Sequence, residues 1–411
     1  MKFSFQSTLF IWLLIGSYLN MSLVIYEGIF IPNFFAYFAG GILLIIHLKR
    51  FLVKKYLFFV LGLFLVSLLS IIFSPKLVPD ILKEQFLSFL QLFLSVFTAM
   101  GLLFFLSSSN PNKVARILFV FIIVLLGGSF FERLIPPFAS ISDWFRFTFY
   151  DSGVYMADQR DLNMVGFIRP KFFAKEPSFV SQFLVLFLLF WHSLSNFEYR
   201  NMVVITLGLF SVFITGSPKV IILFPLLLLL NLHVLKKLLV NYHVIFIFFF
   251  SIIMIFIILS IFFLFDQRLE DVIAGKDQSF NMRILVPAAV IGFALSRYPF
   301  FGVGLGAKEN SLAVFNDILS SFGYDWMVSQ NFEPNFHSYF LEAIHFYGIL
   351  GIVLIAYTFN KFLLRGFSRN KKFIFWTSLI LISLMGGSIV GVRTWLTVVL
   401  LYYCIDKIKY V

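Results

Sequence analysis

Arginine, lysine and glutamate side chains gather in one short stretch that precedes a long apolar run. The stretch spans residues 169–178 and reads RPKFFAKEPS, so three cations and the carboxylate of Glu176 lie close together along the chain. Arginine suits phosphate groups because its planar fork donates two parallel hydrogen bonds and stays charged at any working pH. The alternative is that these cations only contact lipid headgroups, as many interfacial cations do.

Further cations lie in two later stretches. Arg283 and Arg297 flank a short apolar segment, and Lys219 follows a Gly-Ser-Pro sequence. Any one of these side chains alone could be a headgroup contact. Taken together, the Arg and Lys residues predict a site for a phosphate or pyrophosphate group.

His337 is the candidate for acid–base chemistry, because histidine is the side chain most easily poised as a base near neutral pH. On a continuous helix that starts near His337, at about 100° per residue, Gly348 and Gly351 would share one stripe with it. Glycines on one face of a membrane helix let a neighbouring helix come close. The alternative is a histidine that merely stands at a helix start. His345, two turns further on, is either a packed core residue or a second functional group.

Other sequence signatures of chemistry are missing. Gly302, Gly304 and Gly306 resemble a dinucleotide-binding loop only superficially, because they follow a membrane-surface segment rather than a strand of a βαβ unit. We expect the backbone to turn sharply there and to let a ligand approach. The chain has no P-loop, no GxSxG elbow and no HExxH sequence, and its acidic residues form no obvious metal site. A mechanism without a metal or another cofactor is the simplest expectation.

Composition bounds the fold class. Of the 411 residues, 60% are hydrophobic and 13% are charged, and long apolar runs recur along the chain. The sequence therefore predicts an all-α polytopic membrane protein, with residues 1–411 as a single integral membrane domain. The net charge of +12 does not indicate nucleic-acid binding, because much of it lies in short loops between spans. The single Cys404 excludes disulfides within the chain, and the first apolar run is expected to be a retained span because it lacks a clear cleavage site.

About twelve spans are expected from the apolar runs and from the basic residues between them. Basic residues occupy every second connection, which places those connections and both termini in the cytoplasm. The Gly-Ser-Pro sequence before Lys219 separates two spans. Counting residues 284–295 as a span would break the alternation, so we expect an interfacial or re-entrant helix there. The approximate span cores are 8–25, 30–48, 56–73, 86–106, 114–132, 177–194, 202–216, 219–235, 244–265, 338–360, 373–388 and 392–406.

Two long connections remain on the external side, at residues 133–176 and 266–336. They are long enough to be functional rather than mere linkers. They carry most of the candidate cations, and His337 follows the second connection directly. Because external loops normally avoid cations near span ends, this placement favours a site for a lipid phosphate or pyrophosphate.

Three segments resemble the O-antigen ligase and polymerase superfamily. His337-Ser338, nine residues, Gly348, two residues and Gly351 match its motif of His, then Asn, Ser or Gln, nine residues, Gly, two residues, and Gly, Thr or Tyr. RPKFFAKEPSF resembles the segment with Arg and Glu-Pro-Ser that precedes a span in Wzy-type polymerases. NMRILVPAAVIGFALSRYPFFGVGLG resembles their segment with Arg, Pro and Gly-x-Gly-x-Gly. The three motifs occur in the right order and on the right side of the membrane, and the span number and the two large periplasmic loops also fit.

The resemblance implies a bacterial inner-membrane enzyme with a GT-C-like fold. Such an enzyme would transfer a glycan from undecaprenyl diphosphate to an acceptor sugar hydroxyl on the periplasmic side. His337 would accept the proton of the acceptor hydroxyl. Arg169 and Arg283 would hold the diphosphate and stabilise the charge of the leaving group.

The same resemblance implies further roles and partners. Lys219 and Arg297 are weaker candidates for holding the diphosphate, and Glu176 would orient an Arg or a sugar hydroxyl. The expected partners are the undecaprenyl-diphosphate-linked oligosaccharide, membrane lipids and a chain-length regulator protein, with no nucleic acid.

Three functions stay open at this point. Glu176-Pro177-Ser178 favours an O-antigen polymerase over an O-antigen ligase, because ligases of the family more often carry Asn-Pro-Asn-like residues there. Ser217-Pro218-Lys219 departs from the Ser-Arg pair that many members have after the Gly, which weakens the assignment of Lys219. A flippase for the same lipid would place charges near the bilayer midplane and often use inverted repeats. A flippase is least favoured, since most charges here lie at span ends or in loops and no repeat is apparent.

Overall fold

The computed structural model describes residues 4–26, 29–150, 154–230, 280–329, 336 and 338–407. Regular structure in these residues is helical apart from one antiparallel hairpin of β1 (Leu23–Tyr26) and β2 (Ile29–Ile31). The prediction of a helical protein is therefore confirmed. His337 and the span predicted at 244–265 lie outside the described residues.

The helices follow one another with short connections over most of the described chain. The part before the first long gap contains α1 (Phe5–Leu19), α2 (Phe34–Ile46), α3 (Leu48–Phe51), α4 (Lys54–Ile72), α5 (Pro79–Ser108), α6 (Pro111–Leu134), α7 (Pro136–Phe149), α8 (Asp158–Val165), α9 (Pro177–Leu194), α10 (Arg200–Thr215), the 3-10 helix η1 (Pro218–Ile222) and α11 (Leu223–Leu230). The later part contains the π-helix η2 (Asn281–Leu285), α15 (Val286–Arg297), the 3-10 helix η3 (Lys308–Ser311), α16 (Leu312–Ser321), α17 (Asp325–Ser329), α18 (Tyr339–Thr358), the π-helix η4 (Phe359–Leu363), α19 (Arg369–Ser383) and α20 (Val392–Lys407).

Five helices in the described residues are long and apolar enough to cross a membrane, namely α4, α5, α6, α9 and α18 continued by η4. Shorter apolar helices include α1, α2 and α10. The chain is thus a multi-pass membrane protein, and the count of twelve spans stays a prediction. The first span was predicted too long, because α1 ends at Leu19, where Asn20 has a left-handed φ of 56°, and the chain then enters β1.

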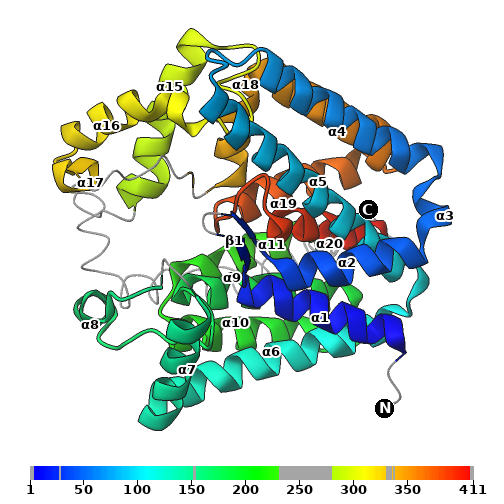
Figure 1. Cartoon of the computed structure of the whole chain (residues 1–411). Coiled ribbons are helices and arrows are strands. Elements are labelled where there is room, and N and C mark those ends of the chain that lie inside the picture. The colour runs from blue at the N-terminus through cyan, green and yellow to red at the C-terminus, as the bar shows by residue number, and fades with distance from the viewer. Residues whose placement is uncertain are drawn as a thin grey trace, which may run out of the picture.

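The helices pack around α5 and α9. Helix α5 contacts α2 and α20, and α9 contacts α6, α10 and α20. Glycines permit the closest approach, since a Cβ on Gly101 of α5 would lie 2.2 Å from the carbonyl oxygen of Gly40 of α2. Figure 1 shows α3 at the right, and α7, α8, α16 and α17 at the left.

The two predicted helix boundaries near candidate residues are confirmed. Helix α10 ends at Thr215, and Gly216 adopts a left-handed φ of 54° before Pro218 opens η1. The segment predicted as a short helix at 284–295 forms α15, directly after the π-helix that contains Arg283. Lys219 and Arg283 therefore both lie at the beginnings of helices.

Helix α18 begins close to the predicted position but is not continuous. Ser338 is its N-cap, and its hydroxyl accepts a hydrogen bond from the N–H of Leu341 at 3.4 Å. At Gly348 the helix breaks, because φ 62° and ψ −171° are not helical. The prediction that Gly348 and Gly351 share a continuous stripe is therefore wrong, since the break redirects every residue beyond it.

The loop over residues 298–306 fits into this break. Its Gly302 has φ 65°, and a Cβ there would lie 2.3 Å from the carbonyl oxygen of His345. A Cβ on Gly348 would in turn lie 2.5 Å from the backbone nitrogen of Gly302. These glycines bring loop and helix backbones together, rather than admitting a ligand or a neighbouring helix as predicted. The N–H to carbonyl hydrogen bonds across the break join Val303 to His345 (3.0 Å), Gly304 to Phe346 (3.2 Å), Ile349 to Pro299 (2.8 Å), Leu350 to Phe300 (3.0 Å) and Gly351 to Phe300 (3.2 Å).

Candidate functional site

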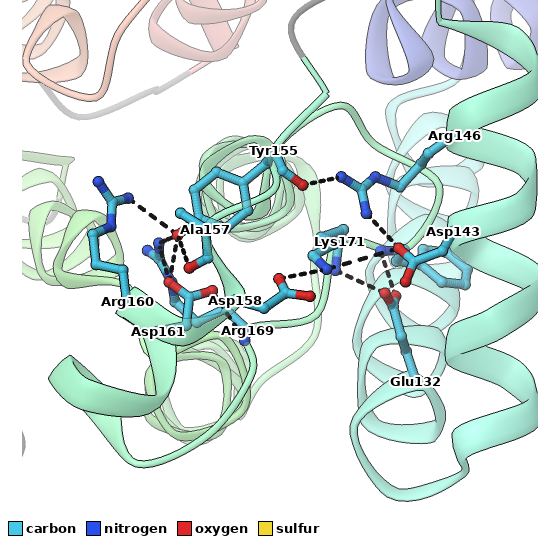
Figure 2. Close-up of polar contacts among 11 residues, drawn as sticks. Glu132, Asp143, Arg146, Tyr155, Ala157, Asp158, Arg160, Asp161, Arg169 and Lys171 are labelled. Atoms are coloured by element: carbon cyan, nitrogen blue, oxygen red, sulfur yellow. Dashed lines mark hydrogen bonds and ion pairs between the residues drawn. The ribbon is translucent and has the colours of Figure 1, made fainter.

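Arg169 is held in place by the short helix α8 (Figure 2). Its Nε donates to Oδ1 of Asp161 at 2.8 Å, and its Nη2 donates to the hydroxyl of Tyr155 at 2.8 Å. Burial alone would lower the pKa of Arg169, but the hydrogen bond and the charge of Asp161 outweigh it and raise the pKa. A guanidinium has five N–H donors, and the contacts in the described part of the chain use the Nε and Nη2 edge. Arg169 is thus oriented by a carboxylate while it stays cationic.

Cationic side chains converge around Lys219. Its ammonium group is near enough to be repelled by the guanidinium groups of Arg283, Arg169 and Arg393 and attracted by the carboxylate of Glu176. The structure thus brings together four of the residues singled out in the sequence, which come from the α8–α9 connection, η1 and η2. With the Asp161 carboxylate that pairs with Arg169 included, four basic side chains stand against two carboxylates, which leaves an excess of positive charge. Such a site attracts an anion, because closely spaced like charges are relieved by a negative ligand.

A small residue, Gly216, lies beside Arg169 and the ring of Phe167. Gly216 precedes η1, and a Cβ on it would lie 3.5 Å from Cγ of Arg169 and 3.0 Å from the ring of Phe167. The guanidinium of Arg133 at the end of α6 lies 3.5 Å from the centroid of that Phe167 ring. The side chains around Gly216 therefore pack α6, the 169–178 stretch and the start of η1 against one another.

Arg393 completes the cluster and was not predicted. Its Nε donates to the carbonyl oxygen of Ser17 at 2.8 Å, and its Nη2 donates to that of Tyr18 at 3.0 Å. Its guanidinium also lies 4.0 Å from the ring centroid of Phe179 in α9. A signal was present in the sequence, because Arg393 begins the last predicted span on the side where cations are normally avoided. Its neighbours α1 and α9, however, come from the distant N-terminal half of the chain.

Glu176 supplies the carboxylate of the cluster. It is the N-cap residue of α9, followed by Pro177 in the first helical position. The hydroxyl of Ser178 donates to Oε2 of Glu176 at 3.0 Å. The chain sequence Glu-Pro-Ser therefore starts a membrane-spanning helix and orients its carboxylate at the same time.

Lys171 takes part in a separate ion-pair network. Its side chain is 4% exposed, and its Nζ lies 2.8 Å from Asp158 and 3.7 Å from Asp143. Asp143 also pairs with the fully buried Arg146, which donates through Nη2 to the carbonyl oxygen of Tyr155 at 2.7 Å. This network, drawn in Figure 2, fastens α7 and α8 to the 169–178 stretch. Lys171 is therefore a structural cation.

The remaining candidates differ in their surroundings. Arg297 is exposed at the end of α15, where its guanidinium lies 5.3 Å from the ring centroid of Phe293. His345 is fully buried in α18, and its Nε2 lies 3.1 Å from the hydroxyl of Ser311. Its ring centroid lies 4.5 Å from that of Phe336, which makes His345 a packed core residue. In the described ranges, no group of three or more His, Cys, Asp or Glu side chains could hold a metal ion.

Part of the chain that contains several of these cations matches a known protein family. Residues 203–356 match a protein-family model described as O-antigen ligase. The match is consistent with the O-antigen ligase and polymerase superfamily that the sequence motifs resemble, and it contains Lys219, Arg283, Arg297 and His337. No curated protein matches the chain. The members of this family are glycosyltransferase-like enzymes.

Proposed function

We propose that the protein is an O-antigen polymerase of the bacterial inner membrane. It joins oligosaccharide repeat units linked to undecaprenyl diphosphate into polysaccharide on the periplasmic side. The observation that carries this proposal is the cationic cluster of Lys219, Arg283, Arg169 and Arg393, with Glu176 among them. Its charge suits a diphosphate, and the family match supports transfer of a lipid-linked glycan.

The cluster would act where charge develops during the reaction. The oxygen of an acceptor sugar hydroxyl forms a bond to the anomeric carbon of the donor glycan, and the bond from that carbon to the diphosphate breaks. The electron pair stays with undecaprenyl diphosphate, whose growing negative charge Arg169 and Arg283 stabilise. Lys219, Arg393 and, more weakly, Arg297 assist. His337 accepts the proton of the hydroxyl, and Glu176 orients an arginine or a sugar hydroxyl.

An apolar groove beside the cluster supports a lipid-linked substrate. The groove has a volume of about 600 Å³ and is lined by α1, α6, Phe145 of α7, and Phe172 and Phe173. Tyr18 is on its wall, and the backbone carbonyl of Tyr18 accepts a hydrogen bond from Arg393. The groove is therefore joined to the cationic cluster through one residue, and its size suits a drug-sized apolar ligand or a segment of a lipid chain. We infer that part of the undecaprenyl tail lies there.

The membrane arrangement belongs to the same proposal. The chain would form one integral membrane domain of twelve spans with cytoplasmic termini, and the connections at 133–176 and 266–336 would lie in the periplasm. A chain-length regulator protein is the expected protein partner, and no cofactor is needed. The five long apolar helices support this arrangement.

An O-antigen ligase is the second candidate, because the matching family model carries that description. A ligase would transfer finished polymer to lipid A–core and would use the same diphosphate site. Glu176-Pro177-Ser178 favours the polymerase. A flippase for the lipid-linked oligosaccharide is the weakest alternative, since the cationic cluster draws on residues near helix ends.

Deletion of the gene in its own host separates the first two candidates. A polymerase mutant is expected to make lipid A–core that bears one repeat unit, whereas a ligase mutant makes bare core. Complementation with the wild-type chain should restore long polymer, and complementation with Arg283→Ala should not. Bare core after deletion would contradict the polymerase proposal.

A further inference from the structure

A strained turn lies between Arg169 and Glu176. Phe172 and Phe173 have positive φ angles of 38° and 64°, two consecutive left-handed residues that are not glycine. Such conformations are unfavourable for residues with a Cβ, and they persist only where the surroundings impose them. The question is which side chains impose this turn.

Glu132 at the end of α6 binds two backbone amides of the turn. Its Oε1 accepts the backbone N–H of Lys171 at 3.1 Å, and its Oε2 accepts the N–H of Phe172. Both oxygens of one carboxylate thus bind two successive amides of the turn. The Glu132 side chain is buried, at 8% exposure, so that these bonds are not in competition with bulk water.

Three further side chains bind the same turn. The N–H of Phe173 donates to the hydroxyl of Ser142 at 3.0 Å. The hydroxyl of Tyr18 donates to the carbonyl oxygen of Phe172 at 2.7 Å, and that of Tyr150 donates to the carbonyl oxygen of Phe173 at 2.8 Å. Helices α1, α6 and α7 and the residue that follows α7 therefore all fix the turn.

The ring of Phe172 adds a steric constraint. It packs against Gly128 of α6 so closely that a Cβ there would lie 2.0 Å from the ring. Gly128 lies one turn before Glu132 in α6, so the same face of the helix receives both the ring and the backbone of the turn.

We propose that Glu132 is a positioning residue for the cationic site. By holding the amides of Lys171 and Phe172, it fixes the backbone two residues after Arg169 and four residues before Glu176. Both carboxylate oxygens of Glu132 face the turn and are occupied by its amides. This inference rests on the proposed function, because the ligand that Arg169 and Glu176 meet is the lipid diphosphate.

Binding of undecaprenyl diphosphate to the full-length protein in detergent tests the proposal without requiring glycosyl transfer. Glu132→Gln keeps the size of the side chain but turns one acceptor into a donor that faces an N–H group. We expect it to weaken binding about tenfold while the thermal unfolding temperature shows that the protein stays folded. Ser129→Ala is the matched control, because Ser129 is also buried in α6 and, in the described residues, its hydroxyl has no hydrogen-bond partner. This control should bind as the wild type does.

A double-mutant cycle separates positioning from general damage. If Glu132 acts through Arg169, the variant with both Glu132→Gln and Arg169→Ala should bind no more weakly than Arg169→Ala alone. Hydrogen exchange of the peptide over residues 170–175 should be faster in Glu132→Gln and unchanged in Ser129→Ala. Additive losses, or wild-type binding by Glu132→Gln, would overturn the positioning role and leave the proposed function intact. A wild-type chain that does not bind the lipid would overturn the proposed substrate, and the positioning role with it.

Discussion

Replacing Gly348 by alanine should detach the 298–306 loop from α18. Alanine would have to adopt φ 62° and ψ −171°, a region essentially restricted to glycine, and its Cβ would lie 2.5 Å from the backbone nitrogen of Gly302. The strain costs roughly 1 to 3 kcal/mol. Five backbone hydrogen bonds cross the break, and if the loop separates instead, their loss at about 1 kcal/mol each would cost about 5 kcal/mol.

The expected loss of unfolding free energy is therefore about 5 kcal/mol if the loop separates, because separation relieves the strain, and roughly 1 to 3 kcal/mol if the loop stays docked and the strain remains. Unfolding of the purified full-length chain, followed by tryptophan fluorescence in increasing denaturing detergent, measures this loss. Gly292→Ala in α15 is the matched control, because nothing lies within 4 Å of the Cβ it would add. The control should be neutral or stabilising by about 0.5 to 1 kcal/mol. Equal stability of Gly348→Ala and Gly292→Ala would refute the docking of the loop into the broken helix.

Three other perturbations test the site and its surroundings. Val120→Trp fills the apolar groove and should weaken undecaprenyl diphosphate binding about tenfold. The control Ile123→Trp is also exposed on α6 but lies outside the groove, so its binding should be unchanged. Equal binding by both variants would argue against the tail site. Arg393→Ala should weaken binding about tenfold more than Arg297→Ala, because only Arg393 belongs to the Lys219 cluster, and a reversed order would contradict the assignment. Tyr150→Phe removes a hydroxyl that donates to two carbonyls and should cost about 1 to 2 kcal/mol. Burial raises the pKa of Tyr150 to about 12, from 10.0 in the unfolded chain. The stability difference between wild type and Tyr150→Phe should therefore be constant from pH 6 to 9 and shrink as the pH rises from 10 to 12. A difference that changes near pH 7 would rule out the hydroxyl as its source.

The sequence predicted local features of the fold where a single residue type determines the backbone conformation. Helix α10 ends at the Gly-Ser-Pro sequence, as expected. A helix was expected to start near His337, and α18 does start there, with Ser338 as its N-cap. The sequence placed Arg169, Lys219 and Arg283 on one predicted side of the membrane, and in the structure Arg169 and Arg283 lie near Lys219. Helix ends and charges at boundaries are readable from local composition.

Features that depend on tertiary contacts were not readable. From the sequence, Gly348 was interpreted as a small residue on one face of a continuous helix. In the structure the 298–306 loop docks at Gly348, and the helix is broken there. Arg393 joins the cluster because α20 packs against α9 and α1 ends nearby, and no sequence spacing records that neighbourhood. The left-handed Phe172 and Phe173 run against their own conformational preference, since Glu132 binds their turn from 40 residues away.

Synthesis by the purified protein tests the central claim most directly. The wild-type chain in detergent would be mixed with repeat units linked to undecaprenyl diphosphate, without lipid A–core, and the products would be sized on a gel. The account predicts a ladder of polymer for the wild type and none for Arg283→Ala or His337→Ala, with both variants folded. Absence of a ladder from the wild type, with transfer appearing only after lipid A–core is added, would contradict the account and identify a ligase.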